Sequence, residues 1–269
     1  MVSEALGGGL ESAIPRAIAV EFIQAATLIH DDFVDQDTLR RNRPAVWTVE
    51  GARRAVLIGD VIFATAIRMM SHLSRDDGLA VSHAIAQVSK GALHEPLDPL
   101  GLAREMESNR SIGELYESII HLKTGILFGT ACHLGAIAAE ADNELRKRSY
   151  RYGLRIGEAY QIADDVKEVK LHLSRQSILP EQMVILAPAL LFFVGEVRPF
   201  IPSFLKGERT DLKGPVSGFF SAAAELMEDE IEHRLQFAVS EVEESFPNNA
   251  YRELMRKAPR DIIKMFNES

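Results

Sequence analysis

The sequence predicts an all-α protein, and three observations lead to this fold class. Segments with apolar residues at helical spacing recur along the chain, and each spans several helical turns. Valine-rich alternating runs bounded by Asn-Gly or Asp-Gly turns, which predict β-hairpins, are absent. Hydrophobic residues make up 46% and charged residues 26% of the 269 residues, as is typical of a globular protein. We therefore expect a single all-helical domain over residues 1–269, a helical bundle around one core.

Turn-forming residues divide the chain into the expected helices. Asn, Asp, Gly and Pro gather at residues 42–44, 76–78, 96–101 and 199–214, and such clusters interrupt helices. We expect helices at residues 12–34, 51–73, 79–95, 104–141, 143–173, 215–245 and 250–266.

The run Met183–Val194 is free of charged residues. It is well short of the ~20 residues that cross a bilayer, and Pro188 lies in its middle. We interpret it as a buried or surface-dipping helix. If the chain contacts a membrane at its periphery, we expect the contact within residues 178–205.

Charge and cysteine content narrow the function classes. The 30 basic and 39 acidic residues give a formal net charge of -9, which argues against nucleic acid as a partner because phosphate binding needs a basic surface. Cys132 is the single cysteine, so an internal disulfide and a cysteine zinc site are excluded. We expect a cytoplasmic protein. The N-terminus shows no basic segment followed by an apolar core, so we expect no signal peptide.

An acidic cluster, Asp31-Asp32-Phe33-Val34-Asp35, ends the first long apolar helix. Asp31 and Asp35 are four residues apart and share a helix face, with Asp32 beside them. Like charges at this spacing repel, so the pair calls for a compensating cation. Mg²⁺ fits, because it takes carboxylate oxygens and shares them with phosphate oxygens of a ligand.

A second cluster, Asp164-Asp165-Val166-Lys167-Glu168, repeats the arrangement. Asp164 and Glu168 have the same spacing, and Gln161 lies one turn earlier, where it could orient a metal-bound water. Either cluster alone is also explained as a solvated helix end. Two of them facing across a helical cavity would hold Mg²⁺ around one diphosphate. The predicted metal ligands are Asp31, Asp32, Asp35, Asp164, Asp165 and Glu168.

Basic residues complete an anion site. Arg40 and Arg41 follow the first cluster, and arginine makes bidentate phosphate contacts that lysine cannot copy. Lys123 is the sole Lys, Arg, Asp or Glu between residues 119 and 139. Because an unpaired buried lysine is costly, we expect a phosphate partner. The alternative is a lysine whose ammonium extends out of the bundle into solvent.

These motifs, in this order, resemble the trans-type polyprenyl diphosphate synthases. Residues 22–44 resemble the first aspartate-rich region of that family, and Gly59-Asp60 its following Gly-Asp pair. Lys123-Thr124-Gly125 is similar to its Lys-Thr element, and residues 157–168 to its second aspartate-rich motif. The resemblance covers residues 4–168 well and is patchy afterwards.

The resemblance implies a fold, a partner and a reaction. The fold is an all-α bundle around a central cavity, of the isoprenoid synthase type, and it usually forms a homodimer. The reaction is Mg²⁺-dependent condensation of an allylic diphosphate with isopentenyl diphosphate to a linear all-trans polyprenyl diphosphate. By analogy the catalytic residues are Asp31, Asp35, Lys123 and Asp164, and the substrate-binding residues are Arg40, Arg41, Gln24, Thr124, Gln161, Ala26 and Thr27.

Product length is expected to depend on residues one turn before Asp31. Ala26 and Thr27 stand there, and by analogy they belong to the wall of the tunnel that holds the growing chain. An aromatic side chain would block this tunnel, whereas Ala and Thr leave it open. We therefore expect a product of geranylgeranyl length or longer.

Three departures from the family pattern concern the isopentenyl half of the site. The chain lacks the Gly-Lys-Arg element that precedes the first motif, and Gln24 stands where the family often has a histidine. The Gly-Lys…Asp segment after the second motif is also missing. Since each lost charge-assisted contact costs about 1.5–3 kcal/mol, binding of isopentenyl diphosphate through Arg41 and Gln24 alone would be weak.

Other functions therefore stay open. The chain could ionise an allylic diphosphate for a different acceptor or for cyclisation. It could also be a non-autonomous subunit of a heteromeric polyprenyl synthase. A helical bundle without activity is the remaining alternative.

Overall fold

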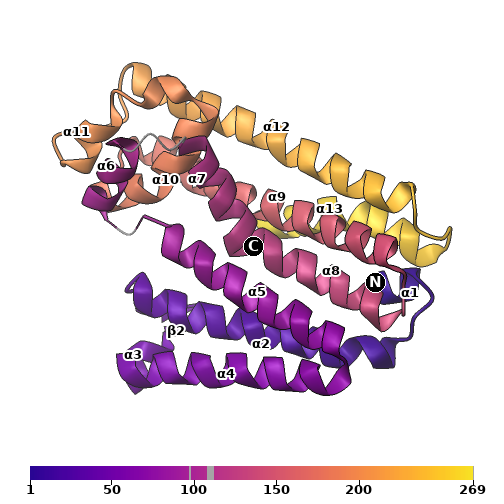
Figure 1. The fold of residues 1–269 in the computed structure, drawn as a ribbon. Helices are drawn as coiled ribbons and strands as arrows, with labels where there is room; N and C mark the ends of the chain where they lie inside the picture. The colour runs from indigo at the N-terminus through magenta and orange to yellow at the C-terminus, as the bar shows by residue number, and fades with distance from the viewer. Residues whose placement is uncertain (97, 108–111, 269) are drawn as a thin grey trace.

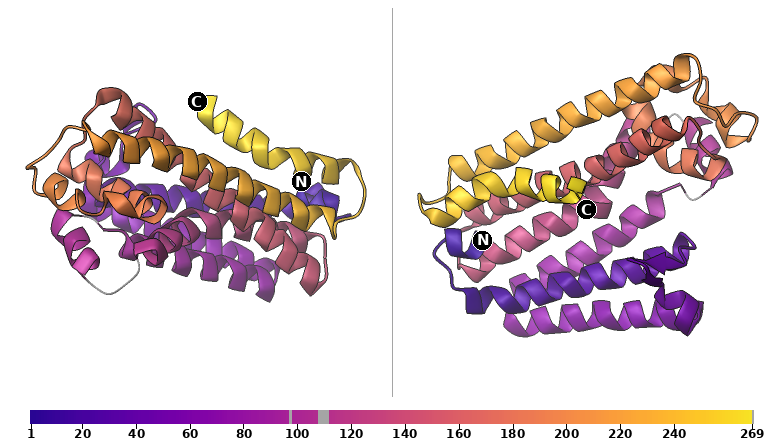
Figure 2. Two further views of the ribbon diagram at one scale, coloured as in Figure 1. Left: turned by 90° about the horizontal axis from the view of Figure 1, so that it is seen from above. Right: turned by 180° about the vertical axis from the view of Figure 1, so that it is seen from behind.

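The computed structural model describes residues 1–96, 98–107 and 112–268, and its regular structure is almost entirely helical (Figures 1 and 2). The all-α prediction is confirmed. The elements are α1 (Val2–Ala5), α2 (Leu10–Val34), β1 (Leu39–Arg40), β2 (Arg43–Pro44), α3 (Val46–Glu50), α4 (Ala52–Leu73), α5 (Arg75–His94), α6 (Pro99–Glu107), α7 (Ile112–Ile119), η1 (Ile120–Gly125), α8 (Ile126–Ala138), α9 (Asn143–Arg175), α10 (Pro180–Phe193), η2 (Gly195–Val197), α11 (Ile201–Leu205), α12 (Pro215–Glu243) and α13 (Ala250–Glu268).

The long helices run side by side and form one bundle. In Figure 1, α4, α2 and α5 make up its lower part, and α8, α9 and α12 its upper part. α9 packs against α8 on one side and α12 on another, and α2 packs against α4 and α8. The acidic end of α2 and the acidic segment of α9 thus belong to different parts of the bundle, as a site between helices requires.

Much of the apolar segment 178–205 belongs to the protein core, and a membrane contact through this segment stays a prediction. Met183, Leu190 and Phe204 are fully buried and belong to a hydrophobic cluster that also contains residues of α9 and α12. Burial of these side chains stabilises the fold, whereas Leu179 and Ile185 of the same segment remain 54% and 61% exposed. The interpretation of Met183–Val194 as a buried helix is confirmed.

Two predicted helix boundaries were wrong. The break expected at residues 76–78 lies at Ser74, whose side chain caps α5 by accepting a hydrogen bond from the Asp77 backbone N–H at 3.0 Å. The expected helix 104–141 is instead divided into α6, α7, η1 and α8, with residues 108–111 outside the described residues.

A short β-hairpin, which the sequence analysis did not expect, follows α2. Leu39 and Arg40 pair with Pro44 and Arg43. The two turn residues, Arg41 and Asn42, have φ angles of 51° and 59°, the left-handed values that a tight two-residue hairpin turn needs. Asn tolerates this conformation well, but Arg41-Asn42 is a weak sequence signal for it. The hairpin holds the predicted anion-binding arginines beside the acidic end of α2.

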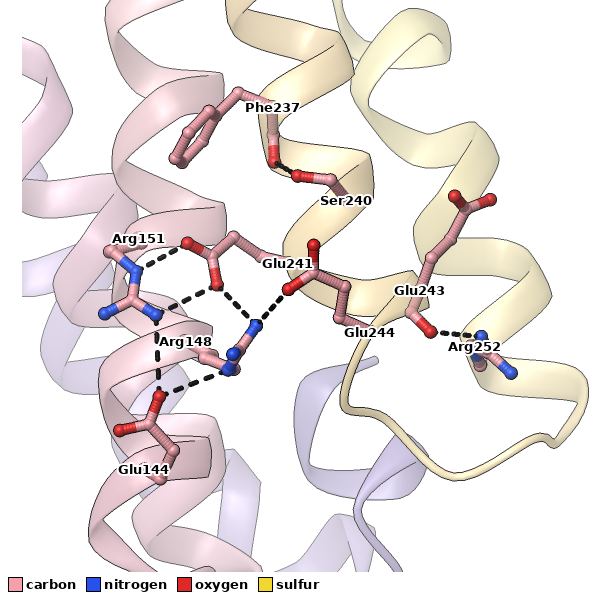
Figure 3. A network of polar contacts seen from close by, with 9 residues as sticks. All are labelled: Glu144, Arg148, Arg151, Phe237, Ser240, Glu241, Glu243, Glu244 and Arg252. Atoms are coloured by element: carbon pink, nitrogen blue, oxygen red, sulfur yellow. Dashed lines mark hydrogen bonds and ion pairs between the residues drawn. The ribbon is translucent and has the colours of Figure 1, made fainter.

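Ion pairs join the N-terminal part of α9 to the C-terminal part of α12 (Figure 3). Glu241 is 5% exposed and accepts hydrogen bonds from Arg151 Nε at 2.5 Å and Nη2 at 3.0 Å. Arg148 Nη1 bridges Glu241 at 3.4 Å and Glu244 at 2.8 Å. The paired arginines satisfy a carboxylate that would otherwise be costly to bury.

α2 and α4 also present apolar side chains to solvent. Both are long and apolar enough to cross a membrane by length and composition alone, and the apolar window of each is only 17% buried. Ile14 and Ile18 on α2, and Leu57 and Val61 on α4, are between 42% and 64% exposed. Apolar surface of this kind is typical of a face that another molecule covers.

Candidate functional site

Four segments supply the predicted site: the end of α2, the hairpin, η1, and the C-terminal half of α9. η1 is a π-helical segment, Ile120–Gly125, inserted between α7 and α8, and it carries Lys123 and Thr124. π-Helical turns are rare and are frequent at functional sites because they turn side chains that a regular helix would place elsewhere. The sequence analysis did not predict it.

Asp31 and Asp35 are carboxylates without a cationic partner of their own. Neither side chain forms a hydrogen bond or ion pair with any residue that the structure describes. Burial raises the pKa of Asp31 to about 6; Lys123 and Arg40 oppose the rise, while Asp35 and Glu95 add to it. Burial likewise raises the pKa of Asp35. A cation bound here would relieve this penalty, as the sequence spacing predicted.

Asp32 has a different environment. It is 3% exposed, and it accepts hydrogen bonds from Arg40 Nε at 2.7 Å and from Arg40 Nη2. The pair is charge-assisted and holds the guanidinium beside Asp31. Asp32 therefore positions Arg40 in this structure, and its assignment as a metal ligand stays a prediction.

The two aspartates of the second motif also differ: Asp164 has no hydrogen-bond partner among the described residues, and Asp165 has two. The Asp164 side chain forms no hydrogen bond or ion pair within the described chain, and burial, with help from Glu168, raises its pKa. Asp165 accepts hydrogen bonds from Tyr116 Oη at 2.6 Å and from Gln161 Nε2 at 3.2 Å. Burial nevertheless raises the pKa of Asp165 to about 7.

Thr124, Gln161 and Asp165 form one hydrogen-bonded chain. Thr124 Oγ1 donates to Gln161 Oε1 at 2.7 Å, and the Gln161 amide then donates to Asp165. The role of Gln161 in orienting a water stays a prediction, since the structure shows it linking η1 to α9. Tyr116 was not predicted, because it lies 49 residues from Asp165 and neither residue type at that separation indicates the contact.

Lys123 already has a carboxylate partner, contrary to the expectation from the sequence. It is not an unpaired buried lysine: its Nζ donates to Glu95 Oε1 at 2.9 Å and Oε2 at 2.7 Å. Burial alone would lower the pKa of Lys123, but Glu95 raises it above its ordinary value, with smaller contributions from Asp31 and Asp35. Glu95, the residue directly after α5, was not predicted.

Lys123 also connects the two acidic motifs electrostatically. Its ammonium opposes the rise that burial causes in the pKa of Asp31 and Asp35 on α2 and of Asp164 and Asp165 on α9. The ammonium on η1 therefore interacts electrostatically with carboxylates of both motifs.

The carboxylates fit Mg²⁺ shared with a phosphate ligand rather than a metal site made by protein alone. Among the residues that the structure describes, no group of three or more His, Cys, Asp or Glu side chains is arranged to hold a metal ion. Mg²⁺ is commonly held by one or two carboxylates, with water and substrate phosphate oxygens completing the octahedron. The pairs predicted from the sequence are Asp31 with Asp35 and Asp164 with Glu168; Glu168 Oε2 lies 3.7 Å from His172 Nε2, and its role as a metal ligand stays a prediction.

The other predicted residues lie on or beside α2. Gln24 is exposed and Ala26 is fully buried, and Thr27 Oγ1 donates to the Gln24 carbonyl at 2.9 Å. Arg41, in the hairpin turn, opposes the rise that burial and Asp164 cause in the pKa of Tyr160 on α9.

His30 on α2 packs against the Gly59-Asp60 pair on α4. Its Nε2 lies 3.0 Å from the Val56 carbonyl oxygen, within hydrogen-bonding distance, and 3.7 Å from Asp60 Oδ1. A Cβ atom at residue 59 would lie 2.2 Å from His30 Nε2, so a larger residue there would displace the His30 ring from its present position. The sequence showed the glycine but not the side chain that lies against it.

Comparison with known proteins gives a consistent picture. Residues 1–174 match the family model described as polyprenyl synthetase. Over 170 residues the chain is 32% identical to the geranylgeranyl diphosphate synthase of Methanosarcina mazei, covering 63% of this chain and 52% of that protein. Over 151 residues it is 31% identical to heptaprenyl diphosphate synthase component 2 of Bacillus subtilis, covering 56% of this chain and 41% of that one. The chain spans about half the length of the curated relatives it matches.

The structural likeness extends beyond the region matched in sequence. The polyprenyl synthase from Caulobacter crescentus, solved with calcium and isoprenyl diphosphate, superposes with a TM-score of 0.69 and 25% identity, covering 97% of this chain and 81% of that one. The segment after residue 174 thus keeps the fold although its sequence resemblance is patchy.

Proposed function

The chain belongs to the polyprenyl synthetase family, and on that premise we propose that it is a Mg²⁺-dependent prenyltransferase. Its substrates are an allylic diphosphate and isopentenyl diphosphate, and its product is a linear all-trans polyprenyl diphosphate. The observation that carries the proposal is the arrangement of Asp31, Asp35 and Asp164. These carboxylates come from α2 and α9, engage no described side chain, and share the electrostatic influence of Lys123. The relative solved with calcium and isoprenyl diphosphate supports this combination of ligands.

The residues at the site provide for cleavage of the allylic C–O bond. Asp31, Asp35, Asp164 and Glu168 would hold Mg²⁺, which would neutralise charge that develops on the departing diphosphate. Arg40 and Lys123 bind the same diphosphate and stabilise it electrostatically as the bond breaks. The double bond of isopentenyl diphosphate then attacks the allylic carbon, and a proton is lost. Arg41 and Gln24 are assigned to the diphosphate of this second substrate.

One incubation tests the reaction type. The pure protein is given geranyl or farnesyl diphosphate and Mg²⁺, with and without isopentenyl diphosphate. Chain growth that requires isopentenyl diphosphate supports the proposal. Release of diphosphate without isopentenyl diphosphate supports transfer to another acceptor, or cyclisation. Turnover that starts only when a second protein is added supports the heteromeric alternative.

A partner subunit is part of the proposal. We propose a homodimer, with the exposed apolar side chains of α2 and α4 as the covered face. The similarity to component 2 of a heptaprenyl diphosphate synthase favours, as a second candidate, a subunit that works with a different chain. Light scattering of the pure protein distinguishes a stable dimer from a monomer that awaits its partner.

Product length is proposed as geranylgeranyl or longer. Thr27 is half-buried and lies one turn before Asp31 on α2. The Thr27→Phe variant is expected to shorten the main product, because an aromatic ring would occupy the space of the growing chain, whereas Thr27→Ser should leave product length unchanged. Chromatography of the products checks both, and farnesyl diphosphate as the only product of the unmodified protein would contradict the proposal.

Mg²⁺ binding is expected to weaken in acid. Because burial raises the pKa of Asp31 to about 6, the free carboxyl carries a proton below that pH and must lose it to bind the metal. The dissociation constant for Mg²⁺ should rise by about ten-fold per pH unit below about pH 6. Calorimetric titrations with Mg²⁺ between pH 5 and 8 measure this, and an affinity that does not change over that range would exclude Asp31 as a ligand.

A further inference from the structure

Glu95 is a carboxylate at the proposed diphosphate site that is not a predicted metal ligand. It follows directly after α5, and both of its oxygens accept hydrogen bonds from Lys123 Nζ, at 2.7 and 2.9 Å. The two side chains are only 21% and 31% exposed, so water screens their attraction less than at the surface. The pair is built into the fold: a Cβ at residue 91, one turn earlier on α5, would lie 3.0 Å from the Lys123 backbone nitrogen.

The charge of Glu95 acts on the same groups that would bind the substrate. It raises the pKa of Asp31 and Asp35, so its negative charge lies within reach of both. A diphosphate anion that enters without a metal meets these carboxylates as repulsive charges. It must also compete with Glu95 for the ammonium of Lys123.

We propose that Glu95 makes diphosphate binding depend on Mg²⁺, by withholding Lys123 from a metal-free anion. The inference rests on the proposed function, in which Lys123 binds a diphosphate. When Mg²⁺ neutralises Asp31 and Asp35, the diphosphate is attracted strongly enough to displace Glu95 from the ammonium. A metal-free diphosphate or a monophosphate is attracted too weakly to displace Glu95. Glu95 is thus a specificity-determining residue that favours the metal-bound form of the substrate.

The test compares binding of inorganic pyrophosphate, by calorimetry, with and without Mg²⁺. The Glu95→Gln variant keeps the side-chain shape and one hydrogen-bond acceptor but loses the charge. Without Mg²⁺ it is expected to bind pyrophosphate about ten-fold more tightly than the unmodified protein, the effect of one charge-assisted hydrogen bond. With saturating Mg²⁺ the difference should be several-fold smaller. Damage to the fold would weaken binding, so a gain in affinity cannot come from that source.

Two further variants make the result specific. In the Lys123→Met background, Glu95→Gln should change metal-free pyrophosphate affinity much less than it does alone, because the two residues act through one contact. Glu228→Gln is the matched control: it breaks a Glu–Lys pair with Lys170 in which both side chains are more than half exposed, and it should change nothing.

The outcomes separate the two proposals. If the unmodified protein does not bind pyrophosphate with Mg²⁺, the proposed function fails. If it does, and Glu95→Gln binds metal-free pyrophosphate no more tightly, only the role of Glu95 is overturned. Weaker binding in the presence of Mg²⁺ together with unchanged metal-free binding would instead assign Glu95 to the metal.

Discussion

Replacement of Asp31 by alanine is expected to lower kcat/KM for prenyl transfer by about 10³-fold or more, and Asp164→Ala should have a similar effect. Each removes a carboxylate that would hold Mg²⁺ on the departing diphosphate, where the charge of the transition state develops. Steady-state rates with an allylic diphosphate and isopentenyl diphosphate measure the loss.

A control on the same helix tests whether the position of the lost carboxylate, rather than the loss of charge, lowers the rate. Glu21→Ala removes one negative charge from an exposed residue of α2, and it should leave the rate unchanged. Circular dichroism shows whether the variants remain folded. Full activity in both aspartate variants would refute the metal assignment, and with it the catalytic part of the proposed function.

The second large effect concerns stability and lies at Glu158. This carboxylate is 2% exposed, and it is paired with His121 at 3.0 Å, with Arg155 at 2.8 Å and with Arg234. The Glu158→Ala variant leaves Arg234, itself 7% exposed, paired with Glu230 at 2.7 Å. Loss of one partner from a buried ion pair typically costs about 3–5 kcal/mol of unfolding free energy, which urea denaturation measures.

The pH dependence of this effect has a defined sign. Burial alone would raise the pKa of Glu158, but His121, Arg234 and Arg155 lower it overall. An acid with a lowered pKa in the folded state contributes stability above its unfolded pKa of about 4.3. That contribution is lost as the pH falls through the folded value. The difference between unmodified protein and Glu158→Ala should therefore be full at pH 7 and shrink in strong acid.

A surface pair provides the comparison for Glu158. Glu228→Ala breaks the exposed pair with Lys170 and should cost less than about 1 kcal/mol, because solvent screens such pairs. Equal losses in the two variants would mean that burial of the Glu158 network contributes nothing to stability.

The metal-binding hypothesis was accessible from sequence because it depends on local spacing. The positions of Asp31 and Asp35, and of Asp164 and Glu168, follow from the period of a single helix. The same reasoning failed between residues 104 and 141, where the expected continuous helix contains the π-helical segment around Lys123. Backbone hydrogen bonding over one such turn leaves no composition signal that distinguishes it from an α-helix.

The helical class, the order of the motifs and the helix faces that carry paired carboxylates could be predicted from the sequence, since they depend on neighbours within a few turns. Which side chains meet became known only from the folded arrangement: Arg40 contacts Asp32, Glu95 contacts Lys123 over 28 residues, and Tyr116 contacts Asp165 over 49. The longer contacts depend on how helices pack, which chain spacing does not encode. Because of that packing, Lys123, which was predicted to be free to bind phosphate, is paired with Glu95.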